Sequence, residues 1–153
     1  MVSSSPQVRY PDFYGIDMAR LEELCAFRAA IALLEERGMW QVLTDTYEAC
    51  KNEELRIKKE ELRMKDEELN HVRSIYAPFT VGEINEKMVE MMRPEGMEAP
   101  IELVFQSIEG LHTAIPKHHG DWYFTGDYPT PGGIRRVNEA FVSWYESRNN
   151  VIS

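Results

Sequence analysis

Few residues of this 153-residue chain have the types and spacing that chemistry requires. The two cysteines, Cys25 and Cys50, form neither a CxxC pair nor a Cys/His cluster, so a zinc site or disulfide framework is not predicted. His118 and His119 are adjacent, and adjacent side chains point apart on a strand and lie about 100° apart on a helix. We therefore interpret the thiols as buried or idle, and the histidines as part of a surface loop rather than a metal site.

A glycine-containing turn also invites a chemical interpretation. The segment Asp127–Gly133 reads DYPTPGG, and glycines are common where backbone amides bind phosphate. It lacks the Lys-Ser/Thr of a P-loop and the GxGxxG spacing of a dinucleotide-binding loop. A turn and linker to the last helix is predicted instead.

Composition restricts the class of protein. The net charge is −9, and the basic residues are interleaved with more numerous carboxylates, which argues against a nucleic-acid partner. There is no basic region followed by an apolar run at the start, and no apolar stretch long enough to span a membrane. With 43% hydrophobic residues the chain could bury one core, so we expect a single cytoplasmic domain without a membrane partner.

Helical periodicity dominates the pattern. Apolar residues recur at three- and four-residue spacing from Leu21 to Leu34, which predicts an amphipathic helix with a C-terminal cap at Arg37-Gly38. A second helix is predicted from about Met39. Two later helices have N-terminal signals, a capping box at Thr80 and a serine at Ser107. Apolar side chains follow on one face of the Thr80 helix (Ile84, Met88, Met91) and of a last helix (Val137, Phe141, Trp144, Tyr145).

Short strands are predicted between these helices. A strand end is expected at Val2-Ser3, a buried strand at Ile101–Phe105, and another strand at Trp122–Phe124. These segments are apolar or aromatic and are bounded by turn-forming residues.

A seven-residue repeat runs through Glu53–Lys59, Glu60–Asp66 and Glu67–Leu69. Its leucines form one thin apolar stripe, and Glu–Lys pairs at i,i+4 add about 0.2–0.5 kcal/mol each. Lysines occupy the second apolar position that a coiled-coil seam needs. The repeat is interpreted as a long solvated helix, with a partner-binding coil as the alternative.

Two runs of mixed residues are specific enough to indicate a family. The first run, Ser3–Met18, reads SSSPQVRYPDFYGIDM. The second run consists of Phe105–Leu111, which reads FQSIEGL, followed by Phe124–Thr130, which reads FTGDYPT. These blocks resemble the C-terminal region of amidophosphoribosyltransferase, in family order, and the resemblance covers about residues 1–30 and 101–131. The tail as far as Tyr145 resembles a subgroup of that family.

The resemblance implies a fold and a function. The fold is expected to be α/β, the C-terminal part of a type I phosphoribosyltransferase-like domain, mostly helical with a few short strands. Residues 1–153 would form one partial domain, and residues 28–78 a charged helical insertion. The family makes phosphoribosylamine from glutamine and phosphoribosyl pyrophosphate, the first committed step of purine nucleotide biosynthesis. Its members commonly assemble as homotetramers, so a homo-oligomer is an open expectation.

The catalytic parts of the family are expected to lie outside this chain. The chain begins Met1-Val2-Ser3 and not with the family's N-terminal cysteine nucleophile, and no acidic loop for phosphoribosyl pyrophosphate is present. Mg²⁺ is expected only for the complete enzyme. The iron–sulfur cysteines of some members are replaced by Gly120 and Tyr123, so no cluster is expected. The chain is expected to be inactive without its N-terminal glutaminase and phosphoribosyltransferase portions.

Three polar residues in the first run remain as substrate-binding candidates. Arg9, Tyr10 and Asp17 lie on a loop that runs near the nucleotide site in the family, where an arginine could pair with phosphate. A structural explanation stays open for each: Arg9 pairing with an acid, Tyr10 packing the loop, and Asp17 capping a helix. The alternative function is a helical interaction or assembly module without enzymatic activity.

Overall fold

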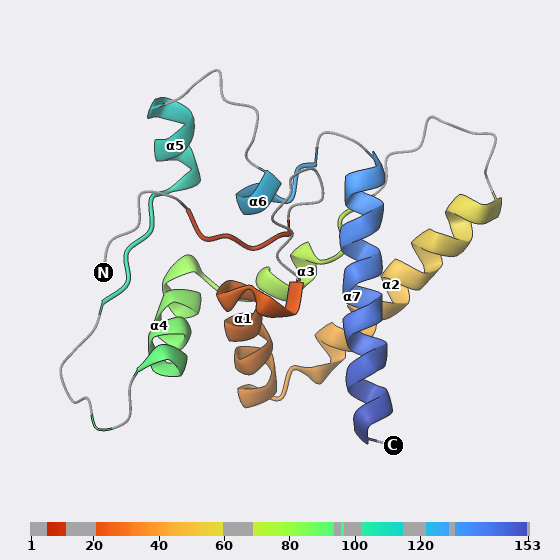
Figure 1. The fold of residues 1–153 in the computed structure, drawn as a ribbon, viewed down its shortest axis with the longest axis horizontal. Coiled ribbons are helices and arrows are strands. Elements are labelled where there is room, and N and C mark those ends of the chain that lie inside the picture. The colour runs from red at the N-terminus through yellow and green to blue at the C-terminus, as the bar shows by residue number, and fades with distance from the viewer. Residues whose placement is uncertain are drawn as a thin grey trace.

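The computed structural model describes residues 6–11, 21–59, 69–93, 96, 102–114, 122–128 and 131–152. The described residues form helices joined by irregular segments (Figure 1). A short 3₁₀ helix, η1, precedes the α-helices, whose bounds are α1 (Cys25–Glu36), α2 (Trp40–Lys59), α3 (Arg73–Tyr76), α4 (Val81–Met92), α5 (Ile108–Ala114), α6 (Trp122–Thr125) and α7 (Pro131–Ile152), with η1 at Leu21–Glu23.

The helices pack as two pairs. α1 packs against α4, and α2 packs against α7, with α3 in contact with both α1 and α2. The extended segment 6–11 runs across the molecule above α1, and α5 and α6 lie beyond it (Figure 1). The first described residues therefore lie at the centre of the fold, between elements that come from distant parts of the sequence.

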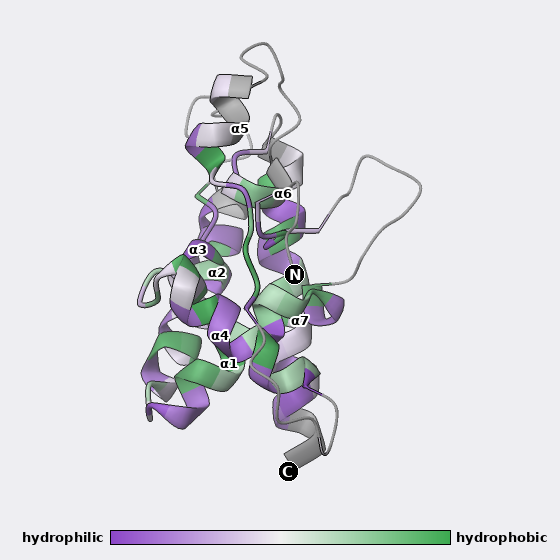
Figure 2. Cartoon of the chain, turned by 90° about the vertical axis from the view of Figure 1, so that its left-hand side faces the viewer, coloured by the Kyte–Doolittle hydropathy of each residue, from purple (hydrophilic) through white to green (hydrophobic). Residues whose placement is uncertain are grey.

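The core is built where α1, α3, α4 and α7 meet. Phe27, Phe141, Ile75 and Ile84 are all at most 1% exposed. Phe27 packs edge-on against Phe141 and Trp144, with ring centroids 6.5 and 5.1 Å apart. Figure 2 shows hydrophobic residues on the facing sides of the helices and hydrophilic residues on their outer sides. Burial of one face of each amphipathic helix thus holds the bundle together.

Local end signals correctly predicted several helix boundaries. Gly38, at φ 67°, follows the C-cap Arg37, and the amides of Gly38 and Met39 donate to the carbonyls of Glu35 and Leu34. This is the paired hydrogen-bond pattern of a Schellman cap. At α4 the Thr80 side chain accepts from the amide of Glu83, and the Glu83 carboxylate accepts from the amide of Thr80. The Ser107 hydroxyl accepts from Gly110 at the start of α5.

The expectation of an α/β fold is wrong for the described residues. No strand or sheet occurs among them, and Val104 takes part only in an isolated β-bridge. The predicted strand at Ile101–Phe105 is instead an irregular segment over its described residues 102–105, in which Leu103 is buried but Val104 is exposed. The strand end predicted at Val2-Ser3 lies outside the described residues. The chain is mostly helical, as expected, but the described part has no sheet.

Two other predicted features differ from the structure. Trp122–Phe124 belongs to α6 and not to a strand, because a short aromatic run fits either state and its surroundings decide. The helix ends before Gly126, at φ 78°, and the amide of Asp127 donates to the Thr125 hydroxyl. The predicted linker before the last helix is shorter than expected, since Pro131 already begins α7, a position that suits proline.

The segment predicted as an insertion, residues 28–78, supplies buried side chains to the core, among them Ala30, Leu34, Val72 and Ile75. Its charged part continues α2 as far as Lys59, beyond which residues 60–68 lie outside the described residues. Leu55, the first leucine of the repeat, is 51% exposed. The first, described heptad of the repeat, residues 53–59, is helical, as predicted.

Candidate functional site at the tyrosine junction

The segment 6–11 is fixed to the bundle through the buried side chain of Gln7. Its Nε2 donates to the carbonyl of Val81, at 3.1 Å, and to Oδ1 of Asn85, at 2.6 Å. Both acceptors belong to the first turns of α4. Its Oε1 accepts from two nitrogens of Arg9. Gln7 thus uses its whole amide to attach the segment to α4 and to orient Arg9.

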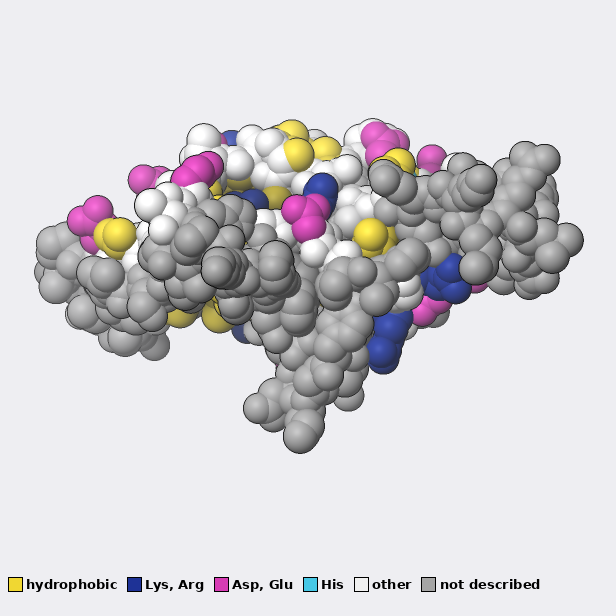
Figure 3. All heavy atoms as spheres, turned by 90° about the horizontal axis from the view of Figure 1, so that it is seen from above, with side chains coloured by type: hydrophobic (Ala, Val, Ile, Leu, Met, Phe, Trp, Pro, Cys, Tyr) yellow, Lys and Arg dark blue, Asp and Glu magenta, His cyan; other side chains and the backbone are white. Residues whose placement is uncertain are grey.

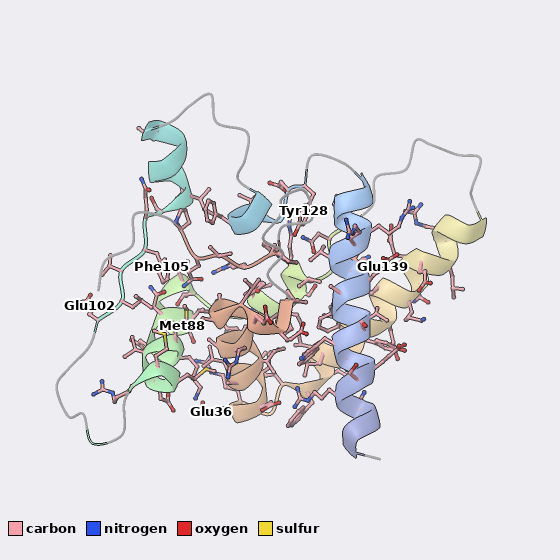
Figure 4. The ribbon with its side chains drawn as sticks, in the orientation of Figure 1. Glu36, Met88, Glu102, Phe105, Tyr128 and Glu139 are labelled. Atoms are coloured by element: carbon pink, nitrogen blue, oxygen red, sulfur yellow. The ribbon has the colours of Figure 1, made fainter. Side chains whose placement is uncertain are left out.

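Three tyrosines anchor the rest of the segment. The Tyr76 hydroxyl donates to the carbonyl of Arg9, and the Tyr128 hydroxyl donates to the carbonyl of Pro11, each at 2.6 Å. The ring of Tyr10 packs edge-on against Tyr76, with centroids 5.6 Å apart. We call Tyr10, Tyr76 and Tyr128, together with Asn70 and Gly126, the tyrosine junction; Figure 4 shows Tyr128 beside the segment.

Asn70 and Gly126 close the tyrosine junction. The Asn70 amide donates to the carbonyl of Gly126 at 3.1 Å, and its oxygen accepts from the amide of Val72. A Cβ on Gly126 would lie 2.6 Å from Nδ2 of Asn70 and 2.9 Å from Cζ of Tyr10. Only glycine allows the chain to approach this closely with φ at 78°.

Burial keeps two tyrosines of the junction, Tyr10 and Tyr76, protonated. It raises the pKa of Tyr10 to about 12, although the nearby guanidinium groups of Arg9 and Arg73 lower it. Burial also raises the pKa of Tyr76 well above its ordinary value. Phenols with such pKa values stay neutral near neutral pH and do not act as general bases. The tyrosine junction is therefore a structural clamp.

Arg9 is the cation that this clamp positions. Its guanidinium lies 4.9 Å from the centre of the Tyr76 ring, and its Nε and Nη2 bind Oε1 of Gln7. Within the described part of the chain no carboxylate contacts it. The alternative that Arg9 pairs with an acid is therefore not observed among these residues. A fixed guanidinium with no carboxylate beside it can bind an added anion.

A second buried polar cluster supports the helix that carries Tyr76. Asn138 of α7 is 5% exposed, accepts from the amide of His71 and donates to the carbonyl of Leu69. The His71 ring binds the carboxylate of Glu53 on α2, at 3.1 Å. Cys50 lies beside Asn138, and burial raises its pKa to about 12, so this thiol is not a ready nucleophile. The cluster fixes the start of α3 between α2 and α7.

The structure brings two of the three predicted site residues together. Arg9 and Tyr10 both lie at the junction, but Tyr10 is 3% exposed and packs the fold, in agreement with the structural alternative. Asp17, His118, His119 and Gly120 lie outside the described residues. Cys25 and Cys50 are free thiols; Cys25 is exposed and Cys50 is buried.

Sequence reasoning missed the partners that hold Arg9 and Tyr10. Tyr128 lies in the second run of resemblance, so a contact between the two runs could have been anticipated. Asn70 and Tyr76 lie in the predicted insertion, where no local pattern indicates that Asn70 binds the carbonyl of Gly126 or that Tyr76 binds the carbonyl of Arg9. Their roles depend on tertiary packing alone.

Tyr128→Phe should destabilise the chain by about 1–2 kcal/mol, because the buried carbonyl of Pro11 would lose its hydrogen-bond donor. Urea unfolding followed by circular dichroism measures the change. Tyr47→Phe is the matched control, since the Tyr47 hydroxyl binds Glu146 at the surface and its loss should have little effect. Equal losses in both variants would show that the Tyr128 bond is not a buried anchor.

Acidic and basic side chains are interspersed on the face in Figure 3. Among the described residues, no three potential metal-ligating side chains gather in one place. None of the described helices combines the length and apolar character needed to cross a membrane.

Comparison with known proteins adds no relative: no protein-family model, curated protein or solved structure matches this chain. Its function is therefore inferred from its own residues and from the contacts between them.

Proposed function

We propose that this chain is the C-terminal portion of an amidophosphoribosyltransferase and serves to complete the part of the enzyme that makes phosphoribosylamine. In this proposal it supplies no catalytic nucleophile. The N-terminal glutaminase and phosphoribosyltransferase portions are its partners, and they carry the N-terminal cysteine, the phosphoribosyl pyrophosphate loop and the Mg²⁺ of the complete enzyme. The compartment proposed for it is the cytoplasm.

One observation carries the proposal: the two runs of resemblance meet. The Tyr128 hydroxyl of the second run donates to the carbonyl of Pro11 in the first run, across 117 positions of the sequence. Gly126 and Tyr10, from the same two runs, lie in contact. The two runs of resemblance therefore form one unit in the fold. The helical architecture described above is the scaffold for this unit.

The same contacts explain what the chain would contribute. Gln7, Tyr76 and Tyr128 fix the segment 6–11 from three directions, so that Arg9 has one orientation. A preorganised arginine binds a phosphate group without a cost of ordering its own side chain. The chain would therefore position a substrate-binding segment next to catalytic groups that its partners supply.

Mixing tests the proposal. The purified chain is combined with an amidophosphoribosyltransferase fragment that carries the N-terminal cysteine and the phosphoribosyl pyrophosphate loop, and phosphoribosylamine formation is measured. Each part alone should be inactive and the mixture should be active. A stable complex that remains inactive would count against an enzymatic role.

A specific observation favours the second candidate, an assembly module. α2 carries a charged helical surface with Leu55 half exposed, and Glu53 and Lys51 already form ion pairs with Arg56 and Glu54 along it. A helix that is stable in water can present such a surface to a partner. Binding of a partner without restored synthesis, lost when Leu55 is replaced by Glu, is the result that would favour this candidate.

A further inference from the structure

Two arginines from different elements converge on the tyrosine junction. Arg9 lies over the ring of Tyr76, 4.9 Å from its centre. Arg73, on α3, forms a side-chain hydrogen bond with Tyr10. Tyr10 packs against Tyr76, and the guanidinium groups of Arg9 and Arg73 both lower its pKa. The two cations thus flank one pair of tyrosine rings.

The two arginines differ in what they bind. Arg9 has no carboxylate beside it in the described part of the chain. Arg73 forms an ion pair with Asp127, and this pair is open to solvent, because the two side chains are 48% and 66% exposed. A carboxylate offers a guanidinium the same pair of oxygens that a phosphate offers. An exposed ion pair is weak, so a stronger anion could replace Asp127.

We propose that Arg9 and Arg73 form one binding site for a phosphate-bearing small molecule. In the free chain, the Asp127 carboxylate binds Arg73 and so competes with the phosphate for it. The bound phosphate would contact both guanidinium groups, and the Asp127 side chain would turn into solvent. This inference rests on the proposed function for the source of the ligand, since an enzyme of phosphoribosyl transfer handles phosphate esters. The site itself is defined by the two arginines and the rings that hold them.

The position of Asp127 gives the site a regulatory property. Asp127 follows Gly126, whose carbonyl is held by Asn70, so its backbone is fixed and only its side chain needs to move. Ligand binding would therefore release one exposed carboxylate without disturbing the tyrosine junction. Removing that carboxylate should strengthen binding, whereas removing either arginine should weaken it.

Calorimetric titration of the purified chain with inorganic pyrophosphate tests this directly. Arg9→Gln and Arg73→Gln should each weaken binding about tenfold or more, the fold-change expected for loss of a charged hydrogen bond. Asp127→Asn should tighten binding about two- to fivefold, as expected for removal of a weak competing ion pair. Arg28→Gln is the charge-matched control, because Arg28 is exposed on α1, and it should bind as the wild-type chain does.

Three results would overturn the inference. The first is that neither the wild-type chain nor Asp127→Asn binds pyrophosphate. The second is that Arg28→Gln and Arg9→Gln lose affinity equally. The third is that Asp127→Asn gains no affinity for pyrophosphate. Circular dichroism establishes that each variant is folded, and a gain in affinity cannot arise from misfolding. The test is independent of the mixing experiment: binding without restored synthesis would refute the proposed function and leave the site, whereas synthesis without arginine-dependent binding would refute the site.

Discussion

Gly126→Ala should destabilise the chain by about 2–5 kcal/mol, the sum of a left-handed backbone without glycine and an overpacked contact. Gly126 has φ of 78°, and its new Cβ would lie 2.6 Å from Nδ2 of Asn70 and 2.9 Å from Cζ of Tyr10. These neighbours are themselves fixed, Asn70 by Val72 and Tyr10 by the ring of Tyr76. To accept the methyl group, the chain would have to break the contact between the two runs of resemblance.

Gly38→Ala separates the two contributions to this loss. Gly38 has a similar φ, 67°, but nothing lies within 4 Å of a Cβ built there. Its substitution should cost only about 1–2 kcal/mol, the backbone contribution alone. Urea unfolding of both variants gives the difference. If the two alanines cost the same, the close packing of Tyr10 and Asn70 around Gly126 would be refuted.

Asn138→Ala should destabilise the chain by about 1–3 kcal/mol, because two partly buried backbone groups would lose the side chain that binds them. The carbonyl of Leu69 would lose its donor and the amide of His71 its acceptor. Both groups belong to the segment that leads into α3. Since α3 carries Tyr76 and Arg73, the loss should also loosen the segment 6–11, and hydrogen exchange should become faster there.

Asn149→Ala provides the control for this prediction. Asn149 lies on the same helix, α7, but is exposed, so its substitution should change the free energy of unfolding by less than about 0.5 kcal/mol. Comparable destabilisation by both substitutions would mean that Asn138 acts through helix propensity and not through its buried hydrogen bonds. If hydrogen exchange at residues 6–11 stayed unchanged, Asn138 would not support the tyrosine junction through α3.

Helices were predictable because their signals are local. The Schellman cap at Gly38 and the capping box at Thr80 depend only on residues a few positions away, and both form as predicted. The apolar face of α4 was only partly correct: Ile84 and Met88 are buried, but Met91 is 42% exposed. The buried residues of α4 lie between Ile84 and Val89, and the pattern alone does not reveal where burial ends.

The strands were not predictable for the opposite reason. A strand needs a neighbouring backbone, and a short apolar run such as Trp122–Phe124 does not reveal whether that neighbour exists. The tyrosine junction was likewise hidden, because Asn70, Tyr76 and Tyr128 reach it through contacts 56, 67 and 117 positions apart in the sequence. Such contacts follow from the packing of α1, α3 and α7, which no single segment encodes.

The proposed function is tested most directly by phosphoribosylamine synthesis in a mixture with the N-terminal fragment of an amidophosphoribosyltransferase, measured for three forms of this chain. The wild-type chain and Gly38→Ala should restore synthesis at a temperature at which all forms are folded. Gly126→Ala should not, because it separates the runs that the Tyr128–Pro11 hydrogen bond joins. An inactive complex with the wild-type chain, or equal synthesis with Gly126→Ala, would contradict the account.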